Sequence, residues 1–168
     1  IEQATAKVKQ IKNTTTMKLT TPAKVLSIAG SDPSGGAGIQ ADIKAITALG
    51  GYAATAITAL TIQNTMGVES VFAAPSKVVA DQIRIVMEDI EPQAIKIGMV
   101  NDAKIVRVIS FALNKYTPKY VVYDPVMVST SGHRLIEDDT VEFIERELIP
   151  LTTLLTPNMH EAEVLWRK

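Results

Sequence analysis

The sequence predicts an α/β fold, a three-layer αβα sandwich around a mostly parallel central sheet. Short apolar stretches rich in small and β-branched residues alternate with amphipathic stretches of helical period, and turn-forming residues separate them. Parallel strands need a long crossover, usually a helix, so this alternation indicates βαβ units with helices on both faces of the sheet. With 168 residues, of which 46% are hydrophobic and 21% charged, the chain has the size and composition of one globular domain.

The composition excludes several classes of protein. The chain contains no cysteine, which rules out disulfides, thiol catalysis and cysteine-bound zinc within it. Its net charge of −1 gives no electrostatic basis for binding nucleic acid or an anionic membrane. No apolar run approaches the roughly 20 residues that a membrane-spanning helix needs. A cytoplasmic enzyme is the expected class.

The first βα unit contains the most distinctive stretch of the chain, residues 27–44. Residues 24–29 predict a strand, a loop of small residues follows, and a helix is expected to begin near Gly38. Gly35, Gly36 and Gly38 let the backbone approach a ligand, and N–H groups of such a loop can face an anion or a polar group. The loop matches neither the Gly-Lys-Ser/Thr phosphate loop nor the dinucleotide G-x-G-x-x-G pattern, and a tight βα turn remains the alternative.

The following stretches continue the alternation. Residues 53–62 are small and β-branched, which predicts a strand buried on both faces. Pro75 and Ser76 open a helix whose apolar positions share one face. The remaining expected elements are strands at 68–73, 94–97, 120–123 and 151–155, and helices with apolar faces within 105–116 and 141–148.

Unusual polar residues follow several of these strands. They are the Gly-rich loop, Gln63-Asn64, Gly98-Met99, Asp124 and Asn158. In open parallel sheets, ligands bind beyond the carboxyl ends of the strands. The sequence therefore predicts an active site at that edge of the sheet.

Two acidic residues are candidates for binding a metal ion. Asp124 follows an apolar strand and precedes Pro125, a position that suits Mg²⁺ binding but also a simple turn. Asn158 and Glu161 have the spacing of a helix capping box, and the glutamate could also face phosphates.

Other polar and apolar candidates have weaker support. The amide of Gln63 can offer a donor and an acceptor to a heteroaromatic ring. The loop 129–132 could contact phosphate or be solvated, and Met99 and Val126 could line an apolar wall or belong to the core. His133 and His160 have no second ligand at metal spacing and are expected to be bystanders.

Taken together, these residues resemble the hydroxymethylpyrimidine/phosphomethylpyrimidine kinase family of thiamin biosynthesis, which belongs to the ribokinase-like superfamily. The resemblance runs from about Lys24 to the end of the chain. It rests on five ordered motifs, AGSDPSGGAGIQADIKA, ITALTIQNTMGV, KIGMV, DPVMVSTSGHRL and LLTPNMHEAE.

The resemblance implies a ribokinase-like fold and ATP-dependent, Mg²⁺-assisted phosphorylation of 4-amino-5-hydroxymethyl-2-methylpyrimidine and then of its monophosphate. By position, the substrate residues would be Gln63 on the aminopyrimidine, Gly30, Ala37 and Asp42 lining its site, and Met99 and Val126 packing around the ring. Asp124 and Glu161 would be the acidic pair near Mg²⁺, and Asn158 would lie near the nucleotide phosphates. The N–H groups of the Gly-rich loop would help to hold the pyrimidine and its hydroxymethyl arm.

The superfamily places its anion hole and catalytic base in a Gly-rich helix start, and no such motif lies between Glu161 and Lys168. The base and the adenine-binding segments are therefore expected beyond Lys168. Residues 1–16 are expected to be an upstream tail or a linker, and residues 17–168 the N-terminal part of the kinase domain.

Two alternatives remain open. Pyridoxal or pyridoxine kinases share similar motifs, although Gln63-Asn64-Thr65 and Thr130-Ser131-Gly132 look like the pyrimidine kinases. A non-catalytic pyrimidine-binding module is the alternative from another class. The partners implied are the small-molecule substrate and, from the family, a second copy of the chain in a homodimer.

Overall fold

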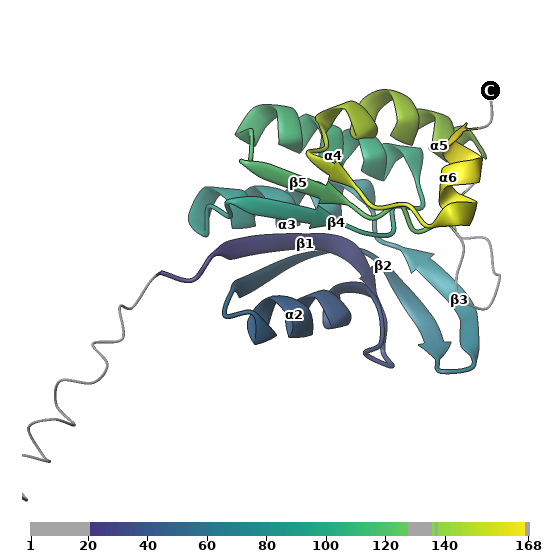
Figure 1. Ribbon diagram of the computed structural model, residues 1–168, viewed down its shortest axis with the longest axis horizontal. Coiled ribbons are helices and arrows are strands. Elements are labelled where there is room, and N and C mark those ends of the chain that lie inside the picture. Colours follow the sequence, from purple (N-terminus) through teal and green to yellow (C-terminus); the bar gives the residue numbers. More distant parts are fainter. Residues whose placement is uncertain (1–20, 128–135, 137, 167–168) are drawn as a thin grey trace, which may run out of the picture.

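The computed structural model describes residues 21–127, 136 and 138–166. Within them, a six-stranded sheet has the order β3-β2-β1-β4-β5-β6 (Figure 1). Every neighbouring pair is parallel except β2 and β3, which are antiparallel. The strands are β1 (Lys24–Ser31), β2 (Tyr52–Asn64), β3 (Gly67–Ala73), β4 (Ala94–Ile97), β5 (Tyr120–Tyr123) and β6 (Leu154–Leu155).

Helices cover both faces of this sheet, which confirms the predicted three-layer sandwich. Figure 1 shows α2 on one side and α4 and α5 on the other. The helical elements are α2 (Gly38–Ala48), α3 (Ser76–Asp89), α4 (Ala103–Tyr116), α5 (Asp138–Phe143), the π-helical turn η1 (Ile144–Leu148), the 3₁₀ turn η2 (Ile149–Leu151) and α6 (Met159–Trp166).

The alternation of side chains along β1 separates an apolar core from a polar face. Leu26 and Ile28 are buried in the core cluster that also contains Val79 and Ile83 of α3. Ser27 points to the opposite face, because successive side chains of a strand alternate, and its hydroxyl donates a hydrogen bond to a residue of α2. The helix covering that second face therefore brings polar groups onto the sheet.

Strand β2 differs from the prediction of a strand buried on both faces. Its first part pairs with β1, but β2 extends beyond the end of β1 and forms a hairpin with β3. Leu60 is 56% exposed and Ile62 48% exposed in this second half. The prediction was wrong there because burial depends on what covers the strand, which composition alone does not reveal.

The predicted strand 151–155 is also shorter in the structure. Leu151 belongs to the 3₁₀ turn η2, in which Pro150 lies at the start and the Thr152 N–H donates to the Ile149 carbonyl. Proline suits the first turn of a helix, because its φ is fixed and it has no N–H to donate to a sheet. Strand β6 consequently retains Leu154 and Leu155.

Several sequence-based predictions fall on residues that the structure does not describe. These are the boundary between residues 16 and 17, the loop 129–132 and His133. Among the described residues, no helix combines the length and the hydropathy required to span a bilayer.

Candidate functional site

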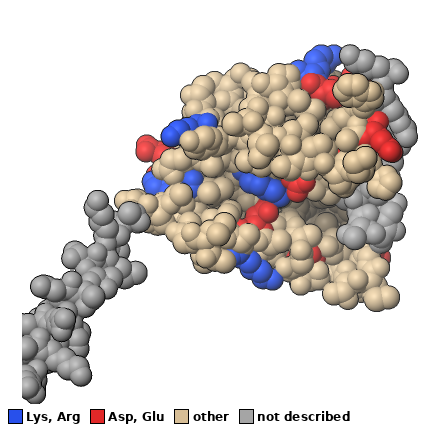
Figure 2. Space-filling model, in the orientation of Figure 1, with Lys and Arg blue, Asp and Glu red and all other residues tan. Residues whose placement is uncertain are grey.

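A pocket of about 490 Å³ lies beyond the carboxyl ends of β1, β4 and β5, at the edge of the sheet that the sequence predicted. Figure 2 shows the hollow on this face of the molecule, with acidic and basic side chains at its rim. The structure brings together in its lining all six residues expected to bind the substrate, together with Asp124. The six are Gly30, Ala37, Asp42, Gln63, Met99 and Val126.

The Gly-rich loop encloses a carboxylate of its own chain. Asp32, which is only 3% exposed, accepts hydrogen bonds from the backbone N–H groups of Ser34, Gly36 and Ala37 at 2.8, 3.0 and 2.8 Å. The Ser34 hydroxyl donates to the same carboxylate. The expectation that the loop N–H groups hold a ligand is therefore wrong for these three, because each already has an internal acceptor.

This arrangement also stabilises the charged form of Asp32. Burial raises the pKa of the carboxyl group, but the hydrogen bonds from Ser34, Ala37 and Gly36 outweigh that effect and lower the pKa below its usual value. Asp32 thus remains ionised near neutral pH and fixes the loop conformation.

Close backbone contact joins the loop to the end of β1. Gly38 has φ +57°, and a Cβ at this position would collide with the carbonyl oxygen of Gly30. The side chain of Gln40 accepts from the Asp32 N–H at 2.9 Å and donates to the Ser31 hydroxyl at 2.8 Å. Glycine at position 38 is therefore required both for the backbone angle and for the space.

A cluster of charged groups lies beside this loop. Asp42 of α2 accepts a 2.6 Å hydrogen bond from the Ser27 hydroxyl, and the Lys96 ammonium lies 3.1 Å from both of its carboxylate oxygens. The same ammonium is 3.7 Å from Oδ2 of Asp124. The cluster therefore places one cation between two carboxylates that line the pocket.

Sequence reasoning missed Lys96 and Ser27. The available signal was a lysine within the otherwise apolar strand β4, two positions before Gly98. A Cβ at residue 98 would lie 3.0 Å from the lysine Nζ, so glycine there leaves room for the ammonium. Asp32 belonged to a motif that the sequence singled out, but its role in the loop was not foreseen.

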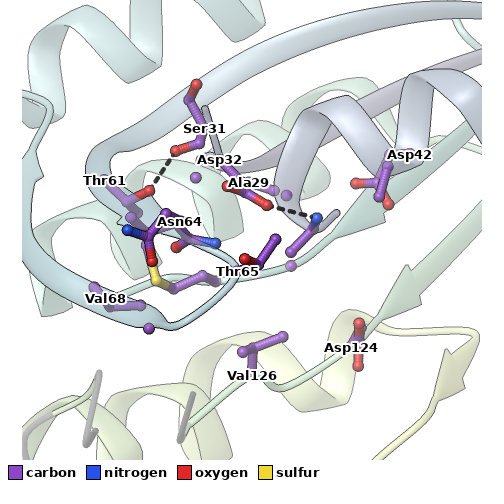
Figure 3. A pocket seen from close by; sticks show the side chains of 18 of the residues that line it. Ala29, Ser31, Asp32, Asp42, Thr61, Asn64, Thr65, Val68, Asp124 and Val126 are labelled. Atoms are coloured by element: carbon purple, nitrogen blue, oxygen red, sulfur yellow. Dashed lines mark hydrogen bonds between the residues drawn. The ribbon is translucent and has the colours of Figure 1, made fainter. Parts of the chain in front are cut away.

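The β2–β3 hairpin forms another wall of the pocket (Figure 3). The Thr61 hydroxyl donates to the Ser31 carbonyl at 2.9 Å, which Figure 3 draws as a dashed line between these two labelled residues, and ties the hairpin to the end of β1. Gln63 is partly buried and lines the pocket two residues further on. The Asn64 side chain accepts from the Met66 N–H at 2.8 Å and shapes the turn.

Met99 lies on the buried side of the pocket. Its carbonyl accepts a 2.8 Å hydrogen bond from the buried Thr58 hydroxyl. A Cβ on Gly30 would come within 2.7 Å of the Met99 methyl group, so this glycine leaves space for the methionine. Figure 3 shows Val126 beyond the end of β5 on the same side as Asp124, across the pocket from Asn64 and Val68.

Asn158 and Glu161 form the predicted capping box at the start of α6. The Glu161 N–H donates to Oδ1 of Asn158 at 3.0 Å, and the Asn158 N–H donates to Oε2 of Glu161 at 2.8 Å. Both residues lie outside the pocket lining. Burial raises the pKa of Tyr123, and the negative charges of Glu161 and Asp124 raise it further.

The described residues contain no cluster of three or more histidine, cysteine, aspartate or glutamate side chains suited to a metal ion. A Mg²⁺ ion would not need one, because it is typically bound by one or two carboxylates together with substrate phosphates. His160 is exposed and lies 3.9 Å from Glu163, away from the pocket lining.

Comparison with known proteins identifies the family of the chain. Residues 32–168 match the family model described as phosphomethylpyrimidine kinase. The chain is 45% identical over 149 residues to a hydroxymethylpyrimidine/phosphomethylpyrimidine kinase of Mycobacterium leprae, covering 87% of this chain and 53% of that protein. The chain thus spans about half the length of this relative.

Solved structures give the same result. The crystal structure of phosphomethylpyrimidine kinase from Clostridium difficile 630 matches with a TM-score of 0.80 and 48% identity, over 85% of this chain and 64% of that one. A pyridoxal kinase from Staphylococcus aureus, in complex with pyridoxal, matches with a TM-score of 0.78 and 34% identity, over 87% of this chain and 54% of that one. These matches confirm the expected ribokinase-like fold. The chain belongs to the phosphomethylpyrimidine kinase family.

Proposed function

We propose that the full-length protein containing this chain is an ATP-dependent kinase for 4-amino-5-hydroxymethyl-2-methylpyrimidine and its monophosphate. The observation that carries the proposal is the content of one pocket. An amide at Gln63, an apolar wall at Met99 and Val126, and the carboxylate of Asp124 line the same cavity of about 490 Å³. This size lies within the range of small-molecule sites, roughly 300–1,000 Å³.

The acceptor would bind by its ring. The Gln63 amide can donate and accept at once, which suits the amino group and the adjacent ring nitrogen of an aminopyrimidine. Met99 and Val126 would pack around the ring. Gly30, Ala37 and Asp42 would line the remaining side, with Asp42 held in place by Ser27 and Lys96.

The phosphate donor would lie toward the end of β5. Asp124 and Glu161 suit a Mg²⁺ ion, because Asp124 lines the pocket after β5 and a second oxygen of Glu161 remains after capping. When bound, Mg²⁺ would neutralise charge on the nucleotide phosphates. The amide of Asn158 would lie near those phosphates.

In the transfer, an acceptor oxygen forms a bond to the γ-phosphorus of ATP as the bond from that phosphorus to the departing ADP oxygen breaks. The hydroxyl proton of the first acceptor passes to a general base. We place this base in the part of the relatives' length that the chain does not span. Positioning and charge neutralisation supply most of the catalysis in such reactions.

The experiment is a comparison of acceptors with the full-length protein and ATP. We expect kcat/KM for hydroxymethylpyrimidine and its monophosphate to exceed that for pyridoxal. Pyridoxal is included because the Staphylococcus aureus pyridoxal kinase has a similar structure. A preference for pyridoxal would overturn the proposal in favour of a pyridoxal kinase, and pyrimidine binding without ATP turnover would indicate a binding module.

We also propose a cytoplasmic homodimer. Leu60 of β2 and Phe72 of β3 are directly paired in the hairpin and are 56% and 61% exposed. Their partly exposed neighbour Ile62 extends this apolar surface on the side facing away from Thr61 and Gln63. Exposed apolar surface of this kind is typical of protein interfaces.

A further inference from the structure

We propose that Lys96 binds the phosphate group of the monophosphate acceptor and so determines how well the protein uses the second acceptor relative to the first. This inference rests on the proposed function. The two acceptors share the pyrimidine ring and differ by one phosphate group, so a residue that distinguishes them must recognise that group.

Lys96 is placed to do so. Its side chain is 24% exposed and lines the pocket from β4, with the ammonium between Asp42 and Asp124. Among the described residues that line the pocket, Lys96 is the one cation. An anionic group entering here would be repelled by the two carboxylates and attracted by this ammonium.

The fold holds the ammonium in position. Ser27 and Lys96 are paired residues on the neighbouring strands β1 and β4, and both side chains donate to the carboxylate of Asp42 in α2. Gly98 leaves the space into which the ammonium projects. The position of the charge is therefore set before any ligand binds, which reduces the entropic cost of recognition.

The ammonium also retains capacity for a ligand. A lysine has three N–H donors. Within the described part of the chain, both carboxylate oxygens of Asp42 lie 3.1 Å from the ammonium, and Asp124 lies too far away at 3.7 Å for a good hydrogen bond. At least one donor can therefore turn to a phosphate oxygen while the contact with Asp42 persists.

The uncharged acceptor makes no such demand. The neutral hydroxymethyl group of this acceptor can lie beside the cluster without a cation. The proposed contacts between the pyrimidine ring and Gln63 do not involve Lys96. Removing the lysine charge should consequently weaken binding of the monophosphate more than binding of the uncharged acceptor.

The test compares full-length wild type with Lys96→Met and Lys96→Gln, by calorimetric Kd and steady-state KM for both acceptors. We expect both constants for the monophosphate to rise about 10- to 100-fold more than those for the uncharged acceptor, because charge-assisted hydrogen bonds to the phosphate are lost. The constants for the uncharged acceptor should rise only as much as in Ser27→Ala, since both changes remove one contact to Asp42. Ser27→Ala removes the other side-chain contact to Asp42 and should affect both acceptors alike. Lys77→Met removes a lysine charge from the exposed face of α3 and should change neither constant.

An equal loss of affinity for both acceptors in the Lys96 variants would overturn the inference, since it would indicate that the lysine acts only by holding Asp42. Unchanged monophosphate binding would overturn it as well. If the variants do not fold, salt titration of the wild type replaces them: Kd for the monophosphate should rise with ionic strength, and a salt response equal to that of the uncharged acceptor would contradict the inference. A wild type that phosphorylates neither acceptor would instead refute the proposed function.

Discussion

The carboxylate of Asp32 lies 2.8 Å from the backbone nitrogen of Ala37, the residue that precedes helix α2. The N–H groups of this loop could bind an external anion, but the carboxylate of Asp32 in the same loop already accepts their hydrogen bonds. The loop is therefore shaped before substrate arrives, and it offers a preformed floor to the pocket. Three of the following five predictions concern this loop.

Replacing Asp32 by asparagine should loosen the loop. The amide keeps one acceptor oxygen but loses the charge that the N–H groups of Gly36 and Ala37 stabilise. We expect a loss of roughly 1–3 kcal/mol in the free energy of unfolding and a higher KM for the acceptor. Urea unfolding and steady-state kinetics measure the two effects. Ser34→Ala, which removes only a hydroxyl donor, should cost less, and wild-type values for Asp32→Asn would contradict the role given to the carboxylate.

The contribution of Asp32 should depend on pH in a defined direction. Its pKa is lower in the folded protein than the unperturbed value of about 3.9. The carboxylate therefore stabilises the fold fully above about pH 4, and this stability is lost as the pH falls through the folded-state pKa. The difference in unfolding free energy between wild type and Asp32→Asn should be constant from about pH 8 to 5 and narrow toward pH 3. A difference that widens on acidification would contradict the assignment.

Gly38→Ala should be much more damaging than Gly50→Ala. Both glycines have positive φ, +57° and +79°, so alanine is strained at either position. At Gly50 no atom lies within 4 Å of the added Cβ, whereas at Gly38 the Cβ would meet the Gly30 carbonyl. We expect a loss of stability at least about 2 kcal/mol greater for Gly38→Ala, because the backbone must also move. Equal losses in thermal unfolding would show that the close contact is relieved without cost.

Glu161→Gln should separate helix capping from metal binding. Glutamine retains an oxygen that can accept from the Asn158 N–H, so stability should change by less than about 1 kcal/mol. If Glu161 also helps to hold Mg²⁺, the variant should need more Mg²⁺ for half-maximal activity. Asn158→Ala is the matched comparison, since it removes the side-chain acceptor of the Glu161 N–H. An unaltered Mg²⁺ requirement in Glu161→Gln would leave only the capping role.

Phe72→Ser should weaken association of the full-length protein. The proposed dimer buries Phe72 and its cross-strand partner Leu60, so a polar side chain there removes apolar contact area. Sedimentation should show a shift toward monomer at micromolar concentration. Phe111→Ser is the control, because Phe111 is 72% exposed on α4 and outside the hairpin. A monomeric wild type, or equal effects of the two substitutions, would contradict this interface.

Local patterns predicted much of the fold. The strand expected at 94–97 and the one at 120–123 coincide with β4 and β5, and the apolar face of α3 is buried as its helical spacing indicated. The errors occurred where burial depends on neighbours, at Leu60 and Ile62, and where Pro150 favours a 3₁₀ turn. In the site, the resemblance to a known family identified residues that do line one pocket, whereas the ion pair of Lys96 with Asp42 was not predicted.

The sequence by itself determined the succession of strands and helices along the chain, the turn at the Gly-rich loop and the capping box of Asn158 and Glu161. Each of these depends on residues only a few positions apart, so local propensity and hydrogen bonding suffice. The tertiary structure alone decided that Lys96, 54 residues from Asp42, lies between it and Asp124. That contact exists because β4 lies between β1 and β5 in the sheet while α2 covers the polar face of β1. The spatial order of strands within the sheet is not encoded in any local stretch of sequence.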